Sequence, residues 1–166
     1  MNASVFAWVG QQVAAFGLLD ASPVLEVGSC DVNGTIRSHF RPERYIGVDV
    51  VEGRGVDRVV SPTELPFDAD FFAAAVSTEM LEHAEFPAAV LWEMRRVLKP
   101  DGVVLLTTRS NGFPPHNPPD YHRFSVAQIT DLLRWVGFVV EVADTDPEAP
   151  GVFVVARKSR PGDFTT

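Results

Sequence analysis

The chain has 166 residues, 46% of them hydrophobic, and it carries a net charge of -8 and a single cysteine, Cys30. This length suits one domain with a sizeable core, and the acidic balance disfavours a polyanion such as nucleic acid as a partner. One cysteine excludes an internal disulfide and a cysteine-clustered metal site, and with no membrane-spanning apolar run and no cleavable leader in the sequence we expect a cytoplasmic protein without a membrane partner.

The first segment predicts an amphipathic helix over about residues 3 to 19. Its apolar residues Phe6, Val9, Val13 and Phe16 recur at intervals of three and four residues, the spacing of one helix face. Such a helix could cover a cofactor, lie on a membrane surface or pack against the domain. Packing is favoured, because the polar side carries glutamines rather than the lysines that a membrane attracts.

The next two strands carry the strongest functional signal. An apolar strand at about 23 to 28 runs into a turn at Gly28, and a short helix is expected to follow. A second apolar strand at about 45 to 50 ends at Asp49, about 21 residues after Gly28. In nucleotide-binding units the turn lets a ligand approach the backbone, and the acidic residue accepts hydrogen bonds from ribose hydroxyls. The segment predicts an adenosine-containing ligand; a tight corner without a ligand is the alternative.

Two familiar phosphate motifs are absent from this turn. A dinucleotide fingerprint requires glycine where Cys30 and Asn33 stand. A phosphate loop requires four residues between its glycines and a lysine after the second, but five separate Gly28 from Gly34 and Thr35 follows. The turn therefore cradles neither a pyrophosphate nor a triphosphate by either motif.

The remaining chain alternates strands and helices. A helix is predicted at about 86 to 98, with Pro87 in its first turn and the segment 99–102 as its stop. Ser125 and Gln128 form a capping box for a further helix that ends at Gly137. Buried or paired strands are expected at about 56 to 60, 72 to 77, 102 to 108, 138 to 143 and 151 to 157. The last two form an antiparallel hairpin, so the pattern predicts an α/β, doubly wound sheet.

Four motifs in the middle of the chain add a family resemblance. They are Leu65-Pro66-Phe67-Asp68, Ser77-Thr78-Glu79-Met80-Leu81-Glu82-His83, Arg96-Val97-Leu98-Lys99-Pro100-Asp101-Gly102 and Asp120-Tyr121-His122-Arg123-Phe124. With the turn at Gly28, they resemble the small bacterial type of class I S-adenosylmethionine (SAM)-dependent methyltransferases over roughly residues 22 to 157. The resemblance implies a Rossmann-like, mostly parallel sheet of seven strands whose last strand is antiparallel. We expect one methyltransferase domain over residues 1–166, with an N-terminal helix in 1–20 and a flexible tail at 158–166.

The resemblance implies SAM as the cofactor. Residues 26–34 would hold its methionine part, with backbone N–H groups facing the carboxylate and Glu26 near the ammonium, while Asp49 takes the ribose. Relatives commonly place an acidic residue where Ser61 stands, so the adenine contact is left to the backbone of 61–63. The predicted cofactor-binding residues are Glu26, Gly28, Ser29, Cys30, Asp31, Gly34, Asp49, Val50, Ser61, Pro62, Thr63 and Thr78.

The predicted catalytic residues are His116, His122, His83 and Glu79. The segment 109–124 has sixteen residues with four prolines, too long for a connecting turn, and we interpret it as a substrate lid. Within it, Asp120 and Tyr121 join the two histidines as candidate base or orienting groups. His83 occupies the Glu-His position of the family. The alternatives are a rigid proline-rich cover, a structural His83 and a solvated Glu79; His39 is expected to be structural.

The predicted function is SAM-dependent methyl transfer to a hydroxyl or amine of a small molecule of the sugar or secondary-metabolite class. No metal is predicted, because His116, Asp120 and His122 do not form a clear facial set. The alternatives are a catalytically silent methyltransferase-like domain that binds a partner protein and a nucleotide-binding oxidoreductase. A homodimer is left open.

Overall fold

The seven strands form one mixed sheet. In the computed structural model, which describes residues 3–41, 44–114, 118–160 and 163, the strand order is β3-β2-β1-β4-β5-β7-β6. The strands are β1 Val24–Val27, β2 Tyr45–Asp49, β3 Arg58–Val59, β4 Phe72–Thr78, β5 Leu98–Arg109, β6 Phe138–Thr145 and β7 Gly151–Lys158. β1 to β5 pair in parallel, and β7 lies antiparallel between β5 and β6. The strand order reverses between β1 and β4, which confirms the predicted doubly wound sheet with an antiparallel last strand.

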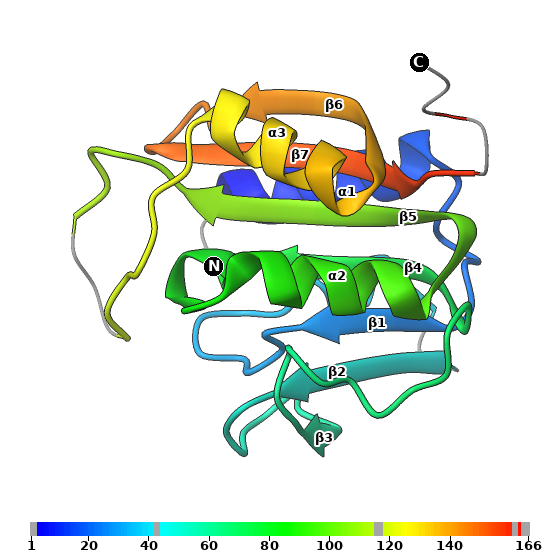
Figure 1. Cartoon of the computed structure of the whole chain (residues 1–166). Coiled ribbons are helices and arrows are strands. Elements are labelled where there is room, and N and C mark those ends of the chain that lie inside the picture. The colour runs from blue at the N-terminus through cyan, green and yellow to red at the C-terminus, as the bar shows by residue number, and fades with distance from the viewer. Residues whose placement is uncertain (1–2, 42–43, 115–117, 161–162, 164–166) are drawn as a thin grey trace.

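Helices cover both faces of this sheet. α2 (Pro87–Val97) and α3 (Val126–Val136) lie on one face and α1 (Ala3–Ala15) on the other (Figure 1). Alternate residues of β1 serve the two faces: Leu25 and Val27 belong to the core beneath α2 and α3, whereas Val24 belongs to the core beneath α1. Each face therefore has its own apolar core.

The N-terminal helix packs against the sheet, as favoured from the sequence. Its buried stripe is Val5, Val9 and Val13, while Phe6 remains 40% exposed and stacks on His39 at a centroid distance of 4.1 Å. The helix ends at Ala15, four residues before the predicted end. No helix among the residues that the structure describes combines the length and apolar character needed to cross a membrane.

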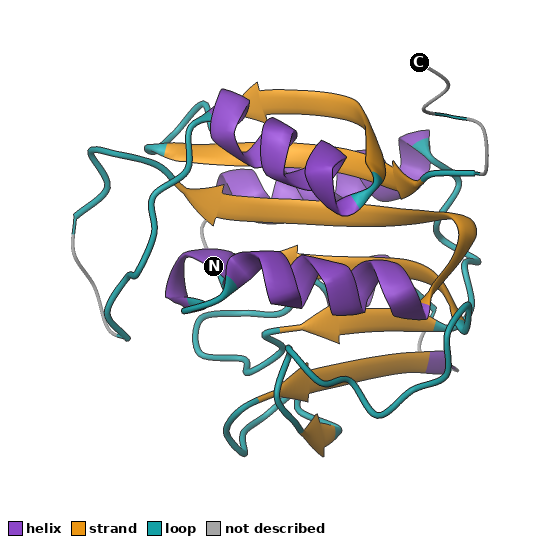
Figure 2. Ribbon diagram, viewed as in Figure 1, coloured by secondary structure: helices purple, strands orange, loops and turns teal. Residues whose placement is uncertain are grey.

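The short helix expected after Gly28 does not form: residues 28–36 are a loop, and a 3-10 turn, η1 (Arg37–His39), follows it (Figure 2). The side chain of Asp31 accepts a hydrogen bond from the N–H of Gly34 at 2.7 Å. Such a local bond competes with helix formation at these residues. The predicted strand at 56 to 60 is likewise shorter, since β3 contains only Arg58 and Val59.

The stop after α2 has a different form from the predicted turn. β5 begins at Leu98, and the pairing of β4 with β5 shifts register so that Phe72 faces Leu98 but Ala74 faces Val103. The residues in between bulge out of the ladder, with Asp101 in the left-handed region at φ 62°. The capping box of α3 is confirmed, because Ser125 and Gln128 each bond the other's backbone N–H.

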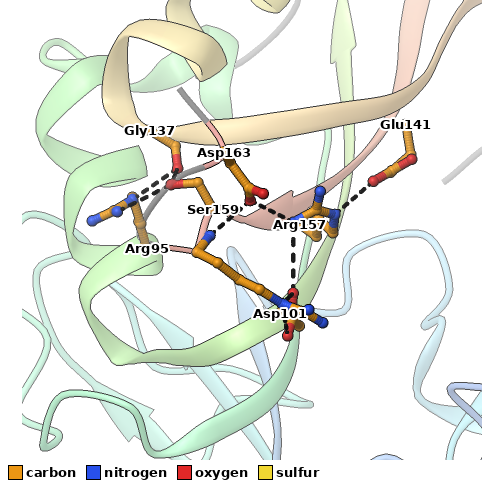
Figure 3. Close-up of polar contacts among 8 residues, drawn as sticks. Arg95, Asp101, Gly137, Glu141, Arg157, Ser159 and Asp163 are labelled. Atoms are coloured by element: carbon orange, nitrogen blue, oxygen red, sulfur yellow. Dashed lines mark hydrogen bonds and ion pairs between the residues drawn. The ribbon is translucent and has the colours of Figure 1, made fainter. Parts of the chain in front are cut away.

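The start of the predicted tail is held to the sheet. β7 extends to Lys158, and Arg157 donates hydrogen bonds to Glu141 at 2.8 Å and to Asp163 at 2.7 Å (Figure 3). Arg160 pairs with Asp101 from the bulge of β5. These contacts lie near the amino end of β5. They hold the first residues of the predicted tail against the sheet.

Candidate active site

The carboxyl ends of β1, β2, β4 and β5 meet at one edge of the sheet (Figure 1). In open α/β sheets ligands bind beyond these ends, where the strand order reverses, here between β1 and β4. Gly28 follows β1, Asp49 ends β2, Glu79 follows β4 and Arg109 ends β5. The topology therefore brings together residues that are far apart in the sequence.

Gly28 makes the turn that leaves β1. Its φ of 81° lies in the left-handed region, which side chains with a Cβ rarely adopt. A Cβ at this position would also lie 2.5 Å from the side chain of Met80, which comes from the loop after β4. The N–H groups of Gly28 and Ser29 donate to Val48 O at 2.9 and 3.1 Å, so the turn is fixed against β2.

Asp49 ties the end of β2 to this turn. Its Oδ2 accepts from the N–H of Cys30 at 3.0 Å, and its Oδ1 accepts from Val50 at 2.7 Å and from Val51 at 3.3 Å. A carboxylate offers about four acceptor positions, so capacity remains for a ribose hydroxyl. The side chain is half-buried, while Val50 beside it is 62% exposed.

Two further N–H groups of the loop, those of Asp31 and Gly34, already have acceptors within the chain. Asp31 N donates to Arg54 O at 2.7 Å, and the side chains of these two residues form an ion pair. Gly34 N donates to Asp31. The backbone donors expected to face the cofactor carboxylate are thus engaged by β2, by Arg54 and by Asp31 of the loop itself, and a carboxylate ligand must share or replace these acceptors.

Glu26 lies on the α1 face of the sheet and is only 5% exposed. The hydroxyl of Tyr45 donates to its Oε2 at 2.8 Å. Burial raises the pKa of Glu26 from its ordinary value of 4.5 to about 7, although the Tyr45 hydrogen bond opposes the shift. The expected contact between Glu26 and the cofactor ammonium remains a prediction. The Tyr45 partner was missed, because no local pattern pairs these two positions.

The predicted adenine segment follows β3. The hydroxyls of Ser61 and Thr63 lie 2.8 Å apart, and both residues are exposed. Pro62 lies between them and is half-buried, as is Thr78 at the end of β4. The structure places these residues near the strand ends, and their contact with adenine stays a prediction.

Glu79 belongs to a buried ion cluster. It adopts a left-handed φ of 54° and forms an ion pair with Arg109, whose side chain is 4% exposed. The same guanidinium lies 3.4 Å from Asp146, in the loop between β6 and β7, and its Cζ lies 4.0 Å from the Phe113 ring centroid. Glu79 is therefore paired rather than a solvated loop carboxylate. Asp146 was missed, since it is distant in sequence and joins the site only through the hairpin.

The last part of the predicted lid is bonded to η3 (Leu81–His83), the 3-10 turn after β4. The N–H groups of Tyr121 and His122 both donate to Glu82 O, at 2.9 and 3.1 Å. The Glu82 carboxyl is fully buried and accepts from the Thr108 hydroxyl at 2.8 Å, and burial raises its pKa. His122 Nε2 lies 3.3 Å from Glu85 O. Residues 118–124, which we call the docked arm of segment 109–124, therefore lie against the loop after β4.

His83 is brought to the same place. Its Nδ1 lies 3.2 Å from Asp120 Oδ1 and 3.3 Å from Pro119 O. His116 lies outside the described residues, so its predicted role stays a prediction. Within the described ranges, His, Cys, Asp and Glu side chains form no group of three or more that could hold a metal. Because His116 is not among them, the expectation of no metal is untested.

The site fits SAM best at its ribose. Asp49 retains acceptor capacity at the end of β2, and the Gly28 turn beside it has no Cβ, so that Met80 from the loop after β4 packs directly against its backbone. The buried Ser29 hydroxyl has no hydrogen-bond partner among the described residues, so it can serve the methionine part. When bound, SAM supplies an activated methyl group; the chain must hold it in line with the acceptor.

The comparisons with known proteins agree with this arrangement. The family described as "Methyltransferase domain" matches residues 25–106, which span β1 to most of β5. No curated protein matches the chain. Among solved structures, 1,6-didemethyltoxoflavin-N1-methyltransferase from Burkholderia thailandensis, with bound S-adenosylhomocysteine, is 20% identical with a TM-score of 0.76, covering 94% of this chain and 79% of that chain.

Two further structures share the fold. A SAM-dependent methyltransferase from Aquifex aeolicus is 15% identical with a TM-score of 0.69, and 95% of this chain and 98% of that chain are covered. The [4+2]-cyclase SpnF is 17% identical with a TM-score of 0.73, covering 93% of this chain and 81% of that chain. At these identities the likeness shows the fold, which hosts more than one chemistry.

Proposed function

We propose that this chain, which carries the methyltransferase domain of the class I SAM-dependent enzymes, transfers the methyl group of SAM to a hydroxyl or amine of a small molecule. The observation that carries the proposal is that candidate cofactor-binding and candidate catalytic residues lie side by side at one edge of the sheet. Gly28 and Asp49 lie at the ends of β1 and β2, where a cofactor binds, and Glu79 and His83 follow β4, where an acceptor can meet the methyl group.

The docked arm of segment 109–124 supports a small acceptor. Tyr121 and His122 are bonded to Glu82, so this arm covers the loop after β4, and we expect it to limit the acceptor to a small molecule. The net charge of -8 also disfavours nucleic acid as the acceptor. An acceptor of the sugar or secondary-metabolite class, and a cytoplasmic location, are parts of this proposal.

Methyl transfer needs alignment and, for a hydroxyl acceptor, a base. The acceptor lone pair forms the new bond to the methyl carbon while the bond from that carbon to sulfur breaks and its electron pair stays on sulfur. The acceptor proton passes to a base of the chain. Glu79, His83 and His122 are the described candidates for that role.

The proposal is tested by incubating the protein with SAM that carries a deuterated methyl group and a panel of small hydroxyl and amine compounds. We expect S-adenosylhomocysteine to form together with one deuteromethylated compound, both detected by mass spectrometry. Cofactor binding without S-adenosylhomocysteine formation for any compound would contradict enzymatic transfer to this class of acceptor.

A second candidate, the catalytically silent domain that binds a partner protein, is favoured by one observation. The N–H groups of Gly28, Ser29 and Asp31 in the Gly28 loop are satisfied by acceptors within the chain, namely Val48 O and Arg54 O. Because these hydrogen bonds form within the chain, the loop does not require a ligand to satisfy those backbone donors. Calorimetry with S-adenosylhomocysteine separates the two, because the silent domain predicts no measurable binding.

A further inference from the structure

We propose that His83 is the general base of the proposed methyl transfer and that Asp120 is its positioning residue, so that the docked arm of segment 109–124 completes the catalytic group. The inference rests on the proposed function and deepens it. It assigns the proton transfer to the imidazole after β4 rather than to the histidines of segment 109–124. The observation behind it is the contact of His83 with Pro119 and Asp120, which lie 36 and 37 residues later in the chain.

The two contacts at Nδ1 assign the proton on the ring. Asp120 Oδ1 lies 3.2 Å from His83 Nδ1 and Pro119 O lies 3.3 Å from the same atom. Both are acceptors, so the neutral imidazole is stabilised with its hydrogen on Nδ1. The lone pair then belongs to Nε2, which is the atom able to take a proton from an acceptor hydroxyl or amine.

Asp120 is held in place for this task. Its Oδ2 forms an ion pair with Arg123, and the side chain of Asp120 is 9% exposed. The planar guanidinium of Arg123 thereby holds the Asp120 side chain in position beside His83. When His83 Nε2 takes the acceptor proton, the imidazolium becomes positive, and the Asp120 carboxylate, 3.2 Å from Nδ1, stabilises that charge electrostatically.

The backbone fixes the distance between the two segments. Glu82 O accepts hydrogen bonds from the N–H groups of both Tyr121 and His122, directly beside the Asp120–His83 contact. His83 therefore keeps its orientation while 16% of its side chain remains accessible. His122 is less suited as the base, because its Nε2 faces a neutral backbone carbonyl, Glu85 O, at 3.3 Å, whereas His83 faces a carboxylate that stabilises an imidazolium.

The first test needs no acceptor. Long-range nitrogen–proton NMR spectra of the full chain, assigned with single His→Gln variants, report which ring nitrogen of each neutral histidine carries hydrogen. We expect His83 to carry it on Nδ1 in the parent protein, and Asp120→Asn to reduce that fraction. Asp131→Asn, at an exposed position of α3, is the matched control and should leave it unchanged. Hydrogen on Nε2 of His83 in the parent protein would overturn the proposal.

The second test uses an acceptor identified with the deuterated cofactor. His83→Gln should lower single-turnover methyl transfer by about 100-fold or more, and Asp120→Asn by about tenfold or more, with unchanged affinity for S-adenosylhomocysteine. His122→Gln should lower it less than His83→Gln. Methyl transfer by His83→Gln at the parent rate would overturn the assignment of the base while leaving the proposed function intact.

Discussion

The pH dependence of stability is expected to depend on the buried carboxyl of Glu26. Its pKa is about 7 in the folded chain, against an ordinary value of 4.5, because burial disfavours the charged form. Between these two values the folded chain binds more protons than the unfolded chain. The stabilising contribution is therefore fully present below about pH 4.5 and is lost as the pH rises through about 7.

The magnitude follows from the gap between the two pKa values. Each pH unit corresponds to about 1.4 kcal/mol, so the free energy of unfolding should lose about 2 to 3 kcal/mol through Glu26 between about pH 5 and pH 8. Glu26→Gln removes the titration while its amide oxygen can still accept from Tyr45. The Gln variant should therefore lack this part of the pH dependence, whatever its own stability at any one pH.

The assay is urea unfolding of the parent protein and of Glu26→Gln at several pH values between about 5 and 8. Glu64→Gln, at an exposed position, is the matched control that leaves every buried carboxyl in place. Other groups, including the buried Glu82, titrate equally in all three proteins and cancel in the comparison. A parallel loss of stability in the parent and in Glu26→Gln as the pH rises would show that Glu26 does not cause the pH dependence.

Three further changes probe the site. Asp49→Asn should weaken binding of S-adenosylhomocysteine by roughly 10- to 100-fold in calorimetry, since it removes a charged acceptor, and unchanged affinity would place the ribose elsewhere. Gly28→Ala should lower the free energy of unfolding by more than Gly17→Ala does; both positions have positive φ, but only Gly28 would bring a Cβ against Met80. Equal losses in urea unfolding would refute that contact. Arg109→Met should cost about 3 to 5 kcal/mol of unfolding free energy, because Glu79 and Asp146 lose their buried partner, and a loss below about 1 kcal/mol would contradict the ion cluster.

The fold was predictable because its signals are local. The alternation of apolar strands and helices, the capping box at Ser125 and Gln128, and the glycine that ends α3 each act within a few residues. The predictions that were wrong are those in which hydrogen bonds to side chains or to other segments outweigh the local sequence preference. The expected helix after Gly28 is replaced by a loop whose N–H groups bond to Asp31, Asp49 and Arg54.

The site was predictable only where one residue follows one strand. Gly28 and Asp49 could be placed from spacing alone, because each ends a strand of the same half-unit. The pairs Tyr45–Glu26, His83–Asp120 and Arg109–Asp146 join segments separated by 19, 37 and 37 residues. No periodicity reports such pairing, which depends on strand order and on where the docked arm rests.

The most direct test of the account is a crystal structure of the chain grown with S-adenosylhomocysteine. We predict that the ribose hydroxyls meet Asp49 at the end of β2, that the methionine part lies over the Gly28 turn, and that the sulfur faces η3 and His83. Density for the ligand at any other place, or a Gly28 loop that keeps all its present hydrogen bonds with no ligand bound at saturating concentration, would contradict the central claim.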